Sequence, residues 1–188
     1  MTAGGLSQYI VGLKVPGTRY ASKMSVLAPQ FTANKSALYT EVRARLSSLL
    51  EGETDLVAML STVVCELHHS FTYFHWTGFY RAFGEELVVG PYQGGHGCLR
   101  IAFSRGVCGA AASTKLTQRY DNVHNAPDHI ACSSSTVSEI VVPVISRSGG
   151  LLAVLDVDSN LASAFCDVDQ RELEAIAAML GARWEACG

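Results

Sequence analysis

The sequence has no long hydrophobic run and little charge of either sign. Charged residues make up 16% of the 188 residues, and the formal net charge is -3. A chain without a basic excess lacks the electrostatic signature of nucleic-acid or anionic-membrane binding. No apolar segment approaches the length of a bilayer span, and no segment has the pattern of a secretory signal. We therefore expect a cytoplasmic protein that binds neither nucleic acid nor membrane.

Acidic residues are absent from the first 40 positions, whose charges are Lys14, Arg19, Lys23 and Lys35. An acid-poor, basic start is typical of organellar transit peptides. This segment has a single Arg, however, and its Gly-Gly and Pro-Gly pairs interrupt an amphipathic helix. We expect a flexible extension over residues 1–34 and one domain over residues 35–188.

The six cysteines lack the Cys-x-x-Cys spacing of a zinc knuckle. A chain that is 48% hydrophobic can build a core without disulfides, and thiols of a reducing compartment are more often catalytic or buried than bridged. We expect no cofactor and no bound metal. The competing hypothesis is a zinc site that combines cysteines with His96, His124 or His129.

Three cysteines fall in the Gly-, Ser-, His- and Asn-rich region between residues 93 and 138, where function is expected. They are Cys98, Cys108 and Cys132. Cys108 lies near the start of a predicted helix, and a helix N-terminus would favour its thiolate. The alternative for all three is a small buried hydrophobe, which is our prediction for Cys65 on an apolar helix.

Hydrophobic periodicity predicts an α+β fold, with a central antiparallel sheet packed by helices and a loop-rich cover over the active site. The predicted helices cover residues 35–50, 55–70 with Thr54 as N-cap, 107–115, and 167–186 with an Asp167/Gln170 capping box. The predicted strands cover residues 72–82, 87–92, 139–145 and 151–158, the last two joined by the turn Ser146 to Gly150.

Three acidic residues interrupt the last two apolar strands. Asp156 and Asp158 share one face of their strand, and the hairpin turn returns Glu139 to their level. Like charges on neighbouring strands repel, so burial there would raise a carboxyl pKa and keep a proton on it at neutral pH. The cluster is a candidate general acid; the alternative is a hydrated acidic patch.

Trp76 and Tyr80 are four residues apart on the aromatic strand and therefore share a face. Packing against a helix explains such residues in general, and it is our prediction for Phe71, Phe74 and Phe79. A Trp ring can also form the wall of a small pocket that accepts a methyl or cationic group.

Seven motifs in order resemble the free methionine-(R)-sulfoxide reductases, which are built on a GAF domain. They are Trp76-Thr77-Gly78-Phe79-Tyr80, Val89-Gly90-Pro91-Tyr92-Gln93-Gly94, Cys98-Leu99-Arg100-Ile101, Gly106-Val107-Cys108-Gly109, His129-Ile130-Ala131-Cys132, Ser138-Glu139-Ile140-Val141-Val142-Pro143 and Leu155-Asp156-Val157-Asp158-Ser159. The resemblance runs from about Lys35 to about Ala186.

The resemblance implies an enzyme that reduces free methionine-(R)-sulfoxide, is a homodimer, and is recycled by a thioredoxin-type dithiol. Cys132 is then the nucleophile, Cys98 the resolving thiol and Cys108 a third cysteine of less defined role. The resemblance also implies that the substrate pocket is lined by Trp76, Tyr80, Glu139, Asp156 and Asp158. Backbone N–H groups of Ile130 and Ala131 are expected to hold the substrate carboxylate. The alternative is a GAF module that senses a small ligand without catalysis.

Overall fold

The computed structural model describes residues 20–125 and 135–184, with side chains from Asn34 onward. Within these residues, six strands form one antiparallel sheet in the order β3-β2-β1-β6-β5-β4. The strands are β1 (Trp76–Phe83), β2 (Glu86–Gln93), β3 (Arg100–Ala102), β4 (Gln118–Tyr120), β5 (Ser138–Ile145) and β6 (Leu151–Ser159). The helices are α1 (Tyr20–Leu49), α2 (Leu56–Ser70), α3 (Gly106–Thr114) and α4 (Asp167–Trp184), with a 3-10 turn at Val123–Asn125.

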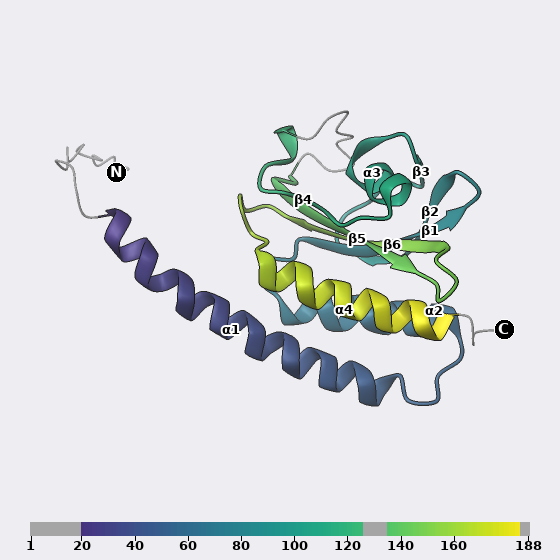
Figure 1. The fold of residues 1–188 in the computed structure, drawn as a ribbon, viewed down its shortest axis with the longest axis horizontal. Coiled ribbons are helices and arrows are strands. Elements are labelled where there is room, and N and C mark those ends of the chain that lie inside the picture. The colour runs from purple at the N-terminus through teal and green to yellow at the C-terminus, as the bar shows by residue number, and fades with distance from the viewer. Residues whose placement is uncertain (1–19, 126–134, 185–188) are drawn as a thin grey trace, which may run out of the picture.

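The sheet lies between two unequal layers (Figure 1). Helices α2 and α4 cover one face of the sheet, and α1 packs against these two helices on the side away from the sheet. Helix α3 lies over the opposite face of the sheet. This arrangement confirms the predicted α+β class with an antiparallel sheet packed by helices. None of the described helices has the length and hydropathy that a membrane span requires.

Side chains alternate along each strand, so successive residues point to opposite faces of the sheet. Phe79, Ile140, Leu155 and similar side chains pack under α1, α2 and α4 in the larger core. Phe71 and Phe74 belong to this core as well, which confirms their predicted structural role. The smaller core lies on the opposite face and contains Trp76, Tyr80, Leu87, Ile101, Val107, Cys108, Ala111, Ala112, Val141 and Val154. Of the predicted site residues, Trp76, Tyr80 and Cys108 therefore lie on the face that α3 covers.

Several predicted boundaries are wrong. Helix α1 begins at Tyr20 and not at Lys35, because the Gly-Gly and Pro-Gly pairs all precede Tyr20. Asp55, not Thr54, is the N-cap of α2, since its carboxylate accepts the Ala58 N–H at 2.8 Å. The aromatic strand starts at Trp76, and the short strands β3 and β4 were not predicted. The division of the chain at residue 34 stays a prediction.

The predicted capping box of α4 is also replaced by a different contact. Asp167 accepts from the exposed guanidinium of Arg119 at 2.9 Å, and Asp169 accepts the Cys166 N–H at 2.7 Å. Asp169 is completely buried and forms an ion pair of 2.6 Å with the buried Lys35 of α1. This contact joins the middle of α1 to the start of α4.

Candidate functional site

The three predicted acids meet at one end of the β5–β6 hairpin. Glu139 lies directly opposite Asp158, and Asp156 pairs with Val141 two residues further along. All three side chains therefore point to the α3 face of the sheet. Glu139 and Asp156 are buried, while Asp158 is half-buried. The predicted cross-strand approach of Glu139 to the two aspartates is confirmed.

Burial raises the pKa of all three carboxyl groups, and it is the largest cause in each case. Repulsion from Asp156 and Asp158 raises the pKa of Glu139 further. The pKa of Asp156 rises to about 7, although hydrogen bonds with Cys108 and Glu139 partly oppose the shift. A hydrogen bond from Thr136 opposes the rise at Asp158. This cluster therefore keeps at least one proton at neutral pH.

Asp156 has one further unusual feature. Its Oδ1 atom is buried and has no hydrogen-bond partner among the described residues. Buried carboxylate oxygens are normally paired, and an unpaired one points to a ligand or ion that completes the site.

Cys108 is the third residue of α3 and faces the acids. One ligating atom from each of Cys108, Glu139 and Asp156 lies within 4.8 Å of the other two. Burial raises the pKa of the Cys108 thiol, and the charges of Asp156 and Glu139 raise it further. The prediction that the helix N-terminus favours a Cys108 thiolate is therefore wrong, because desolvation and nearby carboxylates outweigh the helix dipole.

Trp76 forms a flat wall beside the acids, since it pairs with Asp158 across β1 and β6. Its indole stacks on Tyr80 at 5.7 Å and on Tyr92 at 5.3 Å between ring centroids. A side chain at Gly78 would collide with the Tyr92 Cβ and come within 2.5 Å of the Trp76 ring. Glycine at this position lets the ring lie against the sheet. Tyr92 was not predicted as part of this wall.

The loop after β2 covers the same aromatic wall. The Trp76 Nε1–H donates to the Gly95 carbonyl at 3.0 Å. A Cβ at Gly97 would lie 2.8 Å from the Tyr80 hydroxyl, so the backbone approaches closely there because the residue is glycine. Cys98 follows, is half-buried, and packs against the smaller core that contains Cys108.

The cysteines of the described chain differ in state. Cys98 is in a disulfide, and its partner is not among the free cysteines Cys65, Cys108 and Cys166. Cys65 is exposed on α2, so the prediction of a buried thiol there is wrong. The helix turns its apolar stripe away from position 65. The predicted site residues Ile130, Ala131 and Cys132 lie outside the described residues.

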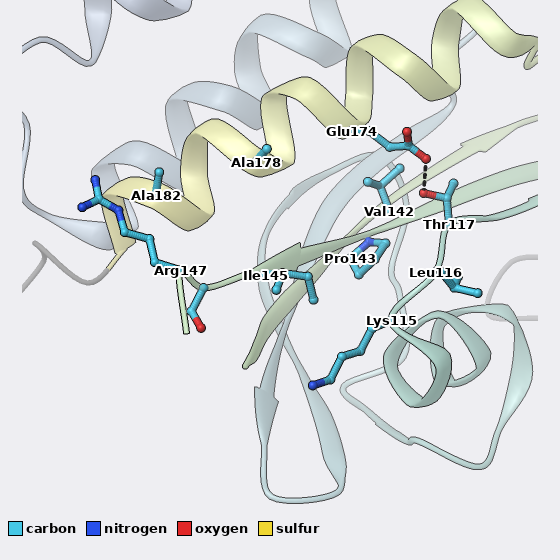
Figure 2. Close-up of a pocket in the computed structure, with 11 residues that line it drawn as sticks. Lys115, Leu116, Thr117, Val142, Pro143, Ile145, Arg147, Glu174, Ala178 and Ala182 are labelled. Carbon is cyan, nitrogen blue, oxygen red and sulfur yellow. Dashed lines mark hydrogen bonds between the residues drawn. The ribbon is translucent and has the colours of Figure 1, made fainter. Parts of the chain in front are cut away.

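A cavity of about 400 Å³ lies where β5 passes α4 (Figure 2). Its rim carries Lys115 and Arg147, and the Thr117 hydroxyl donates to Glu174 at 2.6 Å across one end. Val142, Pro143, Ile145, Ala178 and Ala182 supply its apolar walls. None of the predicted site residues that the structure describes lines this cavity, so it is separate from the acid cluster.

Comparison with known proteins connects this geometry to a family. No family model matches the chain. The free methionine-R-sulfoxide reductase of Escherichia coli is 37% identical over 147 residues, which are 78% of this chain and 88% of that protein. A solved GAF domain is similar with a TM-score of 0.76 and 35% identity, over 82% of this chain and 89% of that domain.

A third relative is the free methionine-R-sulfoxide reductase of Neisseria meningitidis, solved in complex with its substrate. It matches with a TM-score of 0.78 and 42% identity, over 81% of this chain and 92% of that chain. The α+β fold with its antiparallel sheet is thus a GAF fold. On this identity and coverage, the chain belongs to the free methionine-R-sulfoxide reductase family.

Proposed function

We propose that this protein reduces free methionine-(R)-sulfoxide to methionine, with Cys132 as nucleophile and a protonated carboxyl of the acid cluster as general acid. The observation that carries the proposal is the buried Glu139–Asp156–Asp158 cluster beside Cys108, Cys98 and the Trp76 wall. A protonated carboxyl, a flat aromatic surface and nearby thiols are what reduction of a small sulfoxide requires.

The acid step is assigned to Glu139. A sulfoxide sulfur is a poor electrophile until its oxygen accepts a proton or a strong hydrogen bond. Burial and the neighbouring aspartates hold the pKa of Glu139 well above its usual range, which favours the protonated form of its carboxyl. That proton goes to the sulfoxide oxygen as the thiolate attacks the sulfur.

In the remaining steps the sulfoxide gains two electrons, which come from Cys132 and are finally replaced by an external dithiol. Attack by Cys132 forms a sulfur–sulfur bond to the substrate as the protonated sulfoxide oxygen leaves as water. A water molecule then attacks the Cys132 sulfur and breaks this bond, which releases methionine and leaves Cys132 as a sulfenic acid. The Cys98 thiol condenses with the sulfenic acid, forms a disulfide and releases water. A thioredoxin-type dithiol then reduces this disulfide. The family resemblance also favours a homodimer and a cytoplasmic location, and both remain predictions.

Chain length supports a role for Cys132 at this site. Ser135 accepts or donates a 2.9 Å hydrogen bond with His75, and the His75 N–H donates to the Asp158 carbonyl at 2.8 Å. Cys132 precedes Ser135 by three residues, which an extended chain spans in about 11 Å at most. A position of Cys132 beside the acids is compatible with this chain length and stays part of the proposal.

Substrate orientation follows from charge. A free amino acid carries an ammonium and a carboxylate, which a residue inside a protein chain lacks. The ionised carboxylates among Asp156 and Asp158 would hold the ammonium, and backbone N–H groups from Ile130 and Ala131 would hold the carboxylate. The Trp76 face, stacked with Tyr80, would accept the S-methyl group.

An epimer assay tests the activity. The protein is incubated with each sulfoxide epimer of free methionine and dithiothreitol, and the amino acids are separated and measured. We expect loss of the R epimer alone. Consumption of neither epimer would instead indicate a small-ligand sensor built on the same GAF fold.

Two cysteine variants test the thiol roles. Cys132→Ser should abolish turnover, and continued multiple turnover would refute its role as nucleophile. Cys98→Ser should release about one methionine per site in a single burst and then stop. Cys166→Ser is the matched control, because its thiol lies near Lys35 on the other side of the sheet and should leave turnover unchanged. Steady turnover by the Cys98 variant would assign the resolving step to Cys108.

A further inference from the structure

We propose that a thiophilic divalent cation such as Zn²⁺ binds the reduced protein between Cys108, Glu139 and Asp156 and excludes the sulfoxide substrate. The three ligating atoms lie within 4.8 Å of one another, and all three side chains are buried. Glu139 and Asp156 come from the paired strands β5 and β6, and Cys108 comes from α3, which packs against both strands. The binding site stands on this geometry alone, whereas the inhibition rests on the proposed function.

The unpaired Asp156 Oδ1 is the independent sign that a ligand belongs here. This atom is buried and has no hydrogen-bond partner among the described residues. Both other members of the trio, Cys108 and Glu139, already flank the Asp156 carboxyl group, because one ligating atom of each lies within 4.8 Å of it. A cation placed between the three side chains would therefore satisfy Oδ1 without recruiting a further residue.

Bond lengths decide which ion fits. Zinc bonds sulfur at about 2.3 Å and carboxylate oxygen at about 2.0–2.2 Å, so tetrahedral ligand atoms lie roughly 3.3–3.7 Å apart. The three atoms have to approach one another by at most about 1.5 Å, which side-chain rotation can supply. One thiol with two carboxylates suits borderline-soft Zn²⁺, whereas Mg²⁺ prefers oxygen ligands alone.

Competition with substrate follows from shared ligands. The proposed substrate ammonium also uses Asp156, the sulfoxide oxygen needs the proton of Glu139, and a divalent cation carries twice the charge of the ammonium. Cation and substrate therefore cannot occupy the cluster together. Zinc would therefore inhibit substrate binding reversibly, without any oxidation of the thiols.

Cobalt is the probe for binding, because a bound thiolate gives Co²⁺ a charge-transfer absorption in the near ultraviolet. The Cys98→Ser/Cys132→Ser double variant removes the two thiols proposed to react. We expect one bound Co²⁺ per chain by elemental analysis, together with this absorption. Adding Cys108→Ser should abolish the absorption, and adding Asp156→Asn should weaken Co²⁺ binding at least about tenfold.

Cys65→Ser is the matched control, because Cys65 is exposed and lies 3.9 Å from the His69 Nδ1 atom, where a surface cation could bind. Adding it to the double variant should leave the absorption unchanged. An absorption that survives Cys108→Ser, or its absence from the double variant, would overturn the proposed site.

Inhibition is measured in single turnovers of the pre-reduced wild-type protein after removal of reductant. Zn²⁺ should raise the half-saturating sulfoxide concentration without lowering the maximal rate, and chelation should reverse the effect, while Mg²⁺ should have none. A lowered maximal rate would mean that zinc acts on Cys132, and it would overturn the competition. A protein that binds cobalt through Cys108 but reduces neither epimer would refute the proposed function and support the cation site.

Discussion

Asp169 and the acid cluster of Glu139, Asp156 and Asp158 lie on opposite sides of the same sheet. Their surroundings differ because Asp169 has a cation as partner. Asp169, on the side of α1 and α4, accepts from Lys35 Nζ at 2.6 Å and from the Tyr73 hydroxyl at 2.6 Å. Burial alone would raise its pKa, but the hydrogen bonds from Lys35, Tyr73 and the Cys166 N–H lower it. The acid cluster on the α3 side forms no ion pair with any described cation, and its pKa values rise.

This difference indicates a structural role for Asp169 and a functional role for the acid cluster. A buried acid with its own cation and donors is satisfied within the fold and holds two helices together. A buried acid cluster without a cation destabilises the fold and favours a cationic ligand or a proton. Proteins retain such local conflicts mainly where they bind or catalyse. The predictions below test whether the two groups respond in opposite ways to the same kinds of substitution.

The largest effect is expected from Glu139→Gln, which keeps the shape of the side chain but removes the transferable proton. We expect kcat/KM for the sulfoxide to fall about 10²–10⁴-fold with the fold intact. Initial rates and thermal unfolding measure the two effects. The control is Glu41→Gln on the exposed side of α1, which should change neither. Wild-type rates in Glu139→Gln would move the acid role to Asp156 or Asp158.

The next effect is on stability. Lys35→Met leaves the Asp169 charge buried without its cation, and we expect the free energy of unfolding to fall by about 3–5 kcal/mol. Urea unfolding measures the change. Arg43→Met is the matched control, because the Arg43 side chain is 54% exposed in its pair with Glu172 and contributes about 1 kcal/mol at most. Equal losses in the two variants would show that burial does not strengthen the Lys35 pair.

Asp156→Asn should act in the opposite direction. The pKa of Asp156 is about 7 in the folded protein and about 4 in the unfolded chain, so the unfolded state loses its proton first. Stability contributed by the protonated group is therefore lost as pH rises from about 4 through about 7. We expect the change in the free energy of unfolding caused by Asp156→Asn to be roughly 2–4 kcal/mol more favourable at pH 8 than at pH 4. The activity of this variant should fall.

Asp169→Asn should change stability in the opposite direction from Asp156→Asn. Because the pKa of Asp169 is lowered in the folded state, its stabilisation is present above about pH 4 and is lost below it. The substitution should therefore destabilise the fold at neutral pH and have less effect in acid. If both aspartate variants changed stability in the same direction at pH 8, the distinction between the two groups would be wrong.

The sequence predicted the acid cluster better than the Asp169 group, for a physical reason. Glu139 and Asp158 are joined by one short hairpin, so strand alternation and the turn fix their register. Trp76 and Tyr80 were placed on one face by the same alternation. Lys35 and Asp169 are 134 residues apart, and no local pattern reports which helices will meet.

Other features depended on packing that sequence patterns do not contain. Tyr92 stacks on Trp76 because a glycine opposite it leaves room, and only the pairing of β1 with β2 shows this. The Cys108 thiol lies near a helix start, as predicted, yet its pKa rises because that helix end is buried against acids. Cys65 is exposed because the apolar stripe of α2 is narrower than its composition indicates.

The smallest expected effect comes from removing one hydroxyl at the Asp169 group. Tyr73→Phe deletes the 2.6 Å hydrogen bond to Asp169 Oδ1, but the Tyr39 hydroxyl still donates to the same atom at 3.1 Å. With Lys35 also in place, the carboxylate stays paired, so we expect a loss of about 1–2 kcal/mol in urea unfolding and no change in kcat. A loss as large as that of Lys35→Met would mean that donors, rather than the cation, hold this charge in the core.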